Sequence, residues 1–218
     1  ITYDELSAKR FYEDMQFLVG EENVMLYPGR DILFYNADVH SMDITSERIK
    51  VIQALSTKKG KVIIASIDAL LNPLSPKETF MSYTRNISEE DSINIEKLSK
   101  ELVQMGYERV SKVEAMGQFA IRGGVIDIYT PIHTEPYRIE LWDDEIDSIR
   151  TFNVYTQRSI NRVKELCIPP NQEIIFPIEL LKKAIPEIKK DGQLLIQQLD
   201  KENKRQSVFN VKQQIDEV

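Results

Sequence analysis

GQFAIRGGVIDIY, residues 117–129, is the stretch that decides the fold of this 218-residue chain, and YRIELW, residues 137–142, continues its pattern. Apolar and polar side chains alternate in both runs, and Gly123-Gly124 separates two alternating segments. Such alternation is typical of half-buried strands, and a glycine pair between two strands is typical of a hairpin turn. The sequence therefore predicts an antiparallel meander, with strands at 118–122, 125–130, 137–142 and 148–154.

The two faces of the predicted meander differ in chemistry. Successive side chains of a strand point to opposite sides, so the apolar residues of 137–142 share one face and are expected to pack on a helix. Arg138 and Glu140 share the other face, and Arg122 points to one side of its own strand. If the register aligns them, two arginines and a carboxylate lie together, which suits a polar protein interface better than a core.

Helical and strand patterns precede the meander. Apolar spacings of three and four residues predict helices at 8–18, around 49–55 and at 95–105. Short apolar runs predict strands at 23–27 and 61–65. The order helix, strand, helix, strand in the first part favours a parallel α/β sheet.

The last part of the chain follows Pro169-Pro170 and has a helical pattern. A helix after Pro177 is expected to be interrupted at Pro186, because proline removes a helical hydrogen bond and clashes with the preceding turn. Residues from Lys201 onward are highly polar, and the sequence predicts a loosely held tail.

Prolines and changes in pattern divide the chain into three expected parts, 1–78, 79–168 and 169–218. The predicted fold class is α/β: a parallel-sheet domain, to which the first and last parts contribute, with an inserted α+β antiparallel-sheet domain. The chain starts at a helix with no strand before it. We therefore expect the first domain to be an N-terminally truncated piece of a longer protein.

Composition excludes several functional classes. The chain has 28 Lys and Arg against 35 Asp and Glu, a formal net charge of -7 and a pI near 5.1. Nucleic-acid binding by counterion release alone needs a basic surface, which this balance argues against. The single cysteine, Cys167, cannot form an internal disulfide, and no apolar run is long enough to cross a bilayer. A cytoplasmic protein is expected.

Catalytic motifs have weak support. The acidic run 143–147 follows an apolar strand and superficially resembles the magnesium-binding motif of a helicase. That motif works beside a G-x-x-x-x-G-K-[ST] phosphate loop, which the sequence lacks, so a solvated acidic turn is favoured. His40 and His133 lie in no ligand spacing with Cys167 or other donors. We expect no catalytic residue, metal or cofactor in this chain.

Three longer strings resemble the UvrB/Mfd interaction domain: residues 106–110, 117–129 and 138–150. Upstream, residues 27–31 and 46–49 resemble the first domain of the Mfd family, the bacterial transcription-repair coupling factors. This resemblance implies a UvrB-like module at the N-terminus of the family's chains. In it, a degenerate helicase-like α/β domain carries an inserted domain that recruits UvrA.

The resemblance also implies site residues and partners. Phe119 alternates to the core side. UvrA contacts are carried over to the opposite face, and Arg109 is a further candidate beside Glu108, where the sequence departs from the family pattern. The implied UvrA-binding residues are Arg122, Gly123, Arg138, Glu140 and Arg109. ATP and magnesium are implied only for motor domains further along the full-length protein, as are contacts with RNA polymerase and DNA.

The leading hypothesis is a non-catalytic adaptor that recruits UvrA to stalled transcription complexes in nucleotide excision repair. A UvrB-type fragment with ATP-dependent damage verification is the alternative. UvrB, however, has an aromatic-rich hairpin where this chain has the short interval 27–47. An intramolecular contact that masks the same face in full-length Mfd is a third hypothesis. Direct DNA contact is also open, through Lys58, Lys59 and Lys61 or through Lys182 and Lys183.

Overall fold

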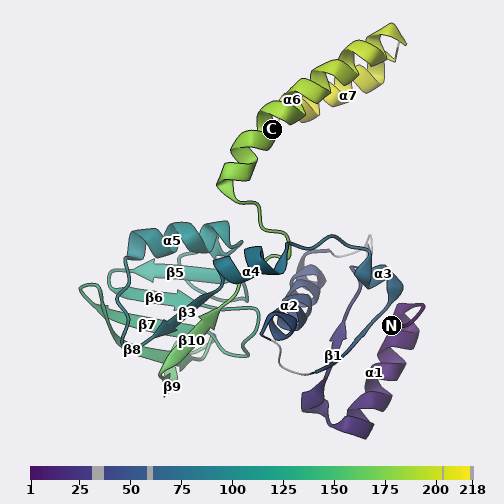
Figure 1. Cartoon of the computed structure of the whole chain (residues 1–218). Coiled ribbons are helices and arrows are strands. Elements are labelled where there is room, and N and C mark those ends of the chain that lie inside the picture. Colours follow the sequence, from purple (N-terminus) through teal and green to yellow (C-terminus); the bar gives the residue numbers. More distant parts are fainter. Residues whose placement is uncertain (31–36, 58–60, 203, 217–218) are drawn as a thin grey trace. The chain divides into compact units, whose positions relative to one another are not determined.

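The computed structural model describes residues 1–30, 37–57, 61–202 and 204–216 (Figure 1). By its contacts the chain forms two compact units, Ile1–Ile175 and Phe176–Val218. Within the described residues, no helix combines the length and apolarity that a membrane span requires. The predicted division into 1–78, 79–168 and 169–218 stays a prediction.

The first unit begins with a small α/β layer. Its strands β1 (Val24–Tyr27) and β2 (Val62–Ala65) pair in parallel, with Val24 opposite Val62. Helices α1 and α2 pack on opposite faces of this pair, α1 around Ala8 and α2 around Val51 (Figure 1). The predicted strands and their parallel pairing are confirmed. The helices of this layer are α1 (Glu5–Val19), η1 (Glu21–Asn23), α2 (Ala37–Ser56), α3 (Ile67–Leu70) and α4 (Lys77–Tyr83).

The boundaries of α1 follow from its end residues. Asp4 caps the N-terminus, since its Oδ1 accepts a hydrogen bond from the Ser7 backbone N–H at 2.7 Å. That hydrogen bond lowers the pKa of Asp4. Gly20 ends the helix at a φ of 89°, a left-handed value that glycine adopts without steric cost.

A six-stranded sheet forms the centre of the first unit, in the order β4-β5-β6-β7-β8-β9. The predicted strands 118–122 and 137–142 are confirmed residue for residue as β5 and β7. Helix α5 (Ile95–Gln104) packs on one face through Leu98 and Leu102, which join the sheet's buried isoleucines in one core. The strands are β4 (Glu108–Arg109), β5 (Gln118–Arg122), β6 (Val125–Ile128), β7 (Tyr137–Trp142), β8 (Glu145–Phe152) and β9 (Ser159–Val163).

Two further strands close this part of the chain. Strand β3 (Arg85–Ser88) pairs antiparallel with β10 (Glu165–Ile168), and Arg85 lies opposite Ile168. Ile87 of β3 and Leu166 of β10 enter the same core as α5 and the six-stranded sheet. The chain therefore enters and leaves the stretch 85–168 through two adjacent strands.

A buried ion network joins the end of this stretch to the α/β layer. The side chains of Arg48 on α2 and Glu173 are both fully buried, and Arg48 Nε donates to Glu173 Oε1 at 2.8 Å. Arg48 also donates to the Tyr27 hydroxyl at 2.6 Å and to the Pro28 carbonyl at 2.6 Å. Arg30 reaches the same Glu173 oxygen at 3.0 Å. Burial raises the pKa of Tyr27 to about 12, so its hydroxyl stays neutral in this network.

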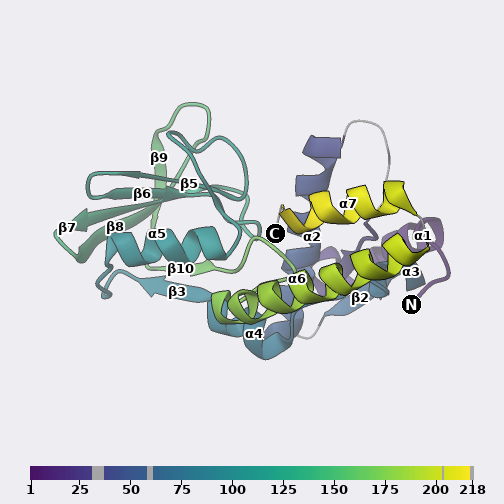
Figure 2. The same ribbon diagram turned by 90° about the horizontal axis from the view of Figure 1, so that it is seen from above.

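The second unit is a helical hairpin of α6 (Ile178–Lys201) and α7 (Arg205–Asp216), which lie side by side and join at one end (Figure 2). The predicted interruption at Pro186 is wrong, because α6 continues through that residue. The predicted loose tail after Lys201 is also wrong, since α7 packs on α6 there and Val208 is buried. Gly192 allows this approach, because a Cβ at that position would collide with Ile215 of α7.

Candidate functional site

The face of the six-stranded sheet opposite α5 carries a cluster of charged side chains, here called the charged face: Arg122, Asp127, Arg138, Glu140 and Arg150. Strand register places them together. Asp127 lies opposite Arg138, Arg138 lies opposite Arg150, and Glu140 lies opposite Ser148. The structure thus places Arg122, Arg138 and Glu140 on one face, as the alternation predicts.

Asp127 is the centre of the charged face. Its side chain is 1% exposed, and its two oxygens accept hydrogen bonds from two arginines. Arg138 donates from Nε to Oδ1 at 2.6 Å and from Nη2 to Oδ2 at 2.9 Å, a forked pair. Arg122 donates from Nη2 to Oδ2 at 2.5 Å. Asp127 therefore holds both guanidinium groups in fixed positions.

Arg138 is held on every side. Its side chain is 16% exposed, and Nη1 donates to the Gln157 carbonyl at 3.2 Å. Its Cζ lies 4.7 Å from the centre of the Phe152 ring, a cation–π contact. The hydrogen bonds to Asp127 raise the pKa of Arg138 above its ordinary value. Arg138 is consequently built into the sheet, with three of its five N–H groups bonded within the chain.

Arg122 differs from Arg138 in exposure and in unused capacity. Its side chain is 52% exposed. Among the described residues, its side-chain contact is the one from Nη2 to Asp127. The remaining N–H groups of the guanidinium face solvent, oriented by the Asp127 contact. Arg122 is therefore better placed than Arg138 to bind an incoming carboxylate.

Glu140 does not supply the carboxylate that joins the two arginines. It accepts a hydrogen bond from Ser148 Oγ at 2.8 Å and lies 3.9 Å from Arg150 Nη2. The sequence analysis grouped Glu140 with the two arginines and missed Asp127. A signal for Asp127 was available, because a two-residue loop at Gly123-Gly124 places Arg122 opposite Val125 and hence Ala120 opposite Asp127.

The two other predicted contact residues lie differently. Gly123 sits at the hairpin tip with a φ of 59°, and an added Cβ would meet nothing within 4 Å. It therefore borders open space beside Arg122. Arg109, on the edge strand β4, lies opposite Phe119 and so alternates toward the core side of the sheet. The structure does not bring Arg109 to the charged face.

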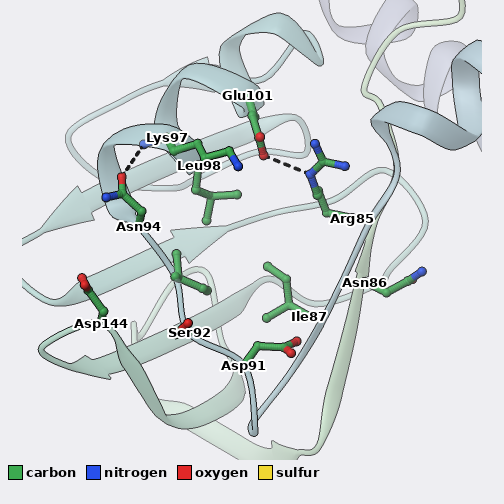
Figure 3. A pocket seen from close by; sticks show the side chains of 11 residues that line it. Arg85, Asn86, Ile87, Asp91, Ser92, Asn94, Lys97, Leu98, Glu101 and Asp144 are labelled. Carbon is green, nitrogen blue, oxygen red and sulfur yellow. Dashed lines mark hydrogen bonds and ion pairs between the residues drawn. The ribbon is translucent and has the colours of Figure 1, made fainter.

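A groove of about 580 Å³ between β3 and α5 is a second possible site (Figure 3). Arg85 and Glu101 on its wall form an ion pair at 2.9 Å. Asp91, Glu101 and Asp144 lie on different sides of the groove and do not converge. In the ranges that the structure describes, no group of three or more His, Cys, Asp or Glu side chains could hold a metal ion. The groove therefore shows no chemistry comparable to the charged face.

The other residues named from the sequence are lysines and a histidine. Lys58 and Lys59 lie outside the described residues, as does the side chain of His40. Lys61 donates to the Glu22 carbonyl. DNA contact through these lysines or through Lys182 and Lys183 stays a prediction.

His133 predicts a pH dependence of stability. Burial lowers its pKa below the ordinary 6.5, and its Nδ1 lies 2.6 Å from Thr130 Oγ1. The unfolded chain therefore binds this proton at higher pH than the folded chain, so stability falls as the pH decreases below about 6.5. Urea unfolding at pH 7.5 and 5.5 should show a smaller acid-induced loss for His133→Gln than for the wild type. Equal losses would contradict this role.

Comparison with known proteins gives consistent results. Residues 86–174 match the model of the UvrB interaction domain. Over 188 residues, 86% of this chain, it is 35% identical to the transcription-repair-coupling factor of Bacillus subtilis (strain 168). Over 189 residues, 87% of the chain, it is 34% identical to that of Staphylococcus aureus (strain Mu50 / ATCC 700699). The chain spans 16% of the length of each relative.

Proposed function

Because residues 86–174 of this chain match the model of the UvrB interaction domain, we propose that the chain is the UvrA-recruiting adaptor module of a transcription-repair-coupling factor, Mfd. The observation that carries the proposal is the charged face, where Asp127 orients a half-exposed Arg122 toward solvent. Such a module brings UvrA to a stalled transcription complex and performs no reaction itself.

The charged face binds through charge-assisted hydrogen bonds. Arg122 offers its unused N–H groups to a carboxylate of UvrA, while Arg138 and Asp127 act as positioning residues behind it. Glu140 and Arg150 extend the polar surface and match charges of opposite sign. Half-exposed ion pairs are screened by salt, so the complex is of the transient, salt-sensitive kind.

The rest of the full-length protein enters the proposal through the family. The parallel pair β1 and β2 supports a degenerate helicase-like α/β domain, into which the UvrA-binding domain is inserted. ATP, magnesium, RNA polymerase and DNA belong to domains outside these residues. An intramolecular contact in full-length Mfd covers the charged face until the factor engages polymerase. Competition between UvrA and a separately expressed C-terminal fragment of Mfd tests that contact.

Charge reversal at Arg122 tests the adaptor function. Arg122→Glu places a carboxylate where the partner's carboxylate binds, so the Kd for UvrA is expected to rise at least tenfold in a calorimetric titration. Arg10→Glu makes the same charge change on an exposed site of α1 and should leave the Kd unchanged. Wild-type affinity of Arg122→Glu would refute the role of the charged face, and absence of wild-type binding would refute the adaptor function.

A further inference from the structure

The turn between β8 and β9, residues 153–158, presents a tyrosine to solvent. Tyr155 lies in this turn and is 92% exposed. A single exposed ring is common on protein surfaces and needs no explanation by itself. What distinguishes Tyr155 is the way in which its turn is held and the groups that lie beside it.

Hydrogen bonds fix the turn. The Oδ1 of Asn153 accepts from the backbone N–H groups of Tyr155 at 3.0 Å and Thr156 at 2.9 Å. The Asn153 N–H donates to the Arg158 carbonyl at 3.0 Å, which closes the turn. Gln157 has a φ of 59°, and its N–H donates to the Asn153 carbonyl at 2.7 Å. A residue other than glycine keeps such a φ only where its surroundings hold it, so the backbone that carries Tyr155 is fixed.

The turn is continuous with the charged face. Its Gln157 carbonyl accepts a hydrogen bond from Arg138 Nη1 at 3.2 Å. The Gln157 side chain also donates to the Val113 carbonyl at 3.4 Å, and Val113 packs with Ala120 of β5. Because Ala120 lies opposite Asp127, this small cluster is on the side of the sheet that carries the charged face. The turn therefore lies on that side too.

A second tyrosine and a carboxylate lie beside the turn. Tyr129 packs against the same small cluster. The Phe152 N–H donates to the Pro136 carbonyl at 3.0 Å, which brings the loop with Glu135 alongside the start of the turn. Burial raises the pKa of Tyr129, and the nearby Glu135 and Tyr155 raise it further. In the part of the chain that the structure describes, Glu135 forms no ion pair. An exposed ring near a carboxylate that has no cation is a combination that attracts one.

We propose that Tyr155 and Glu135 bind a lysine or arginine side chain of UvrA. This assignment rests on the proposed function. It gives the surface two contacts of opposite sign at opposite ends of the strands, because Arg122 beside the Gly123-Gly124 hairpin takes a carboxylate. Two such contacts fix the orientation in which the partner docks, since the reversed orientation brings like charges together.

Affinity measurements with purified UvrA test the contact. Tyr155→Ala is expected to raise the Kd about tenfold in a calorimetric titration, the loss typical of a contact tyrosine. Tyr155→Phe should keep most of the affinity, because the ring face remains. Glu135→Gln should raise the Kd as well, and by a smaller factor when Tyr155 is already alanine, because the two act on one cation. Phe17→Ala removes a similarly exposed ring from α1 and should have no effect.

Ring fluorination tests whether the bound group is a cation. Phenylalanine analogues with one, two and three ring fluorines at position 155 withdraw electron density from the ring face, so the Kd should rise with each fluorine. Loss of affinity in Tyr155→Ala without this dependence would overturn the assignment of a cation.

Two other outcomes separate this contact from the adaptor function. Tight wild-type binding with full affinity of Tyr155→Ala would overturn the contact and leave the adaptor function intact. No binding of the wild-type chain would overturn the adaptor function, and the contact with it. Because Tyr155 is exposed, the circular dichroism spectrum of each variant should match the wild type.

Discussion

Replacing Glu173 by alanine is expected to lower the free energy of unfolding of the first unit by about 3–5 kcal/mol, the loss typical of breaking a buried ion pair. The variant leaves the Arg48 guanidinium fully buried without its carboxylate partner. Arg30 loses the same partner at 3.0 Å. The desolvation cost of the Arg48 charge then stays in the folded state without compensation, and this cost dominates the loss.

Urea unfolding followed by circular dichroism measures this loss. The matched control is Glu101→Ala, which breaks the part-exposed ion pair with Arg85 and should cost about 0–1 kcal/mol. A double variant, Arg48→Met with Glu173→Leu, removes both charges and should recover much of the stability lost in Glu173→Ala. If Glu173→Ala and Glu101→Ala cost the same, the network does not stabilise the unit as proposed.

Replacing Asp127 by alanine is expected to cost about 2–3 kcal/mol of stability, because hydrogen bonds to charged groups contribute strongly when they are buried. Arg138 would lose both bonds of its forked pair while its side chain remains largely buried. The cost is smaller than at Glu173, because Arg138 keeps its bond to the Gln157 carbonyl and reaches water at its exposed edge. Arg122 would lose the contact that orients it.

The same urea assay measures the Asp127 effect, and calorimetry with UvrA adds a second readout. Asp127→Ala should weaken UvrA binding even where the variant is fully folded, because Arg122 is no longer positioned. Glu140→Gln is the control on the same face. Its side chain is part-exposed, so neutralising it should change stability by less than about 1 kcal/mol. A stable Asp127→Ala variant with unchanged binding would show that Arg122 needs no orienting carboxylate.

Much of the central sheet could be predicted from the sequence, because alternation and turn residues are local signals. The runs 118–122 and 137–142 alternate strictly, and glycines at 123 and 124 mark the turn between β5 and β6. Residues 95–104 have an apolar stripe and end before Gly106, which has a φ of 87°. These features depend on neighbours in sequence, and the structure follows them closely.

Features that depend on distant residues could not be predicted in the same way. Strand β3, with the sequence RNIS, has little strand character of its own and is stabilised by pairing with β10, about 80 residues later. Arg48 and Glu173 meet only because this pairing returns the chain to α2. The interruption expected at Pro186 does not occur, since the residues on both sides of it form one continuous helix, α6.

The site shows the same division between local and distant information. Alternation together with the strand register places Arg122 and Arg138 on one face. The roles of the two arginines differ through their burial, which the strand pattern does not report. Asp127 reads in sequence as an ordinary outward-facing acid. Its importance follows from the register between β6 and β7, which places it opposite Arg138.

The pairing of β3 with β10 has a consequence for how such a module can be inherited. Arg85 and Ile168 are paired neighbours, so the segment between them begins and ends at nearly the same place. If this inserted segment is removed or exchanged, a short linker can span the gap. The pairing of β1 with β2 in the rest of the first unit does not depend on it. Recombination between genes could therefore transplant a docking module intact, with both junctions at a single point of the host.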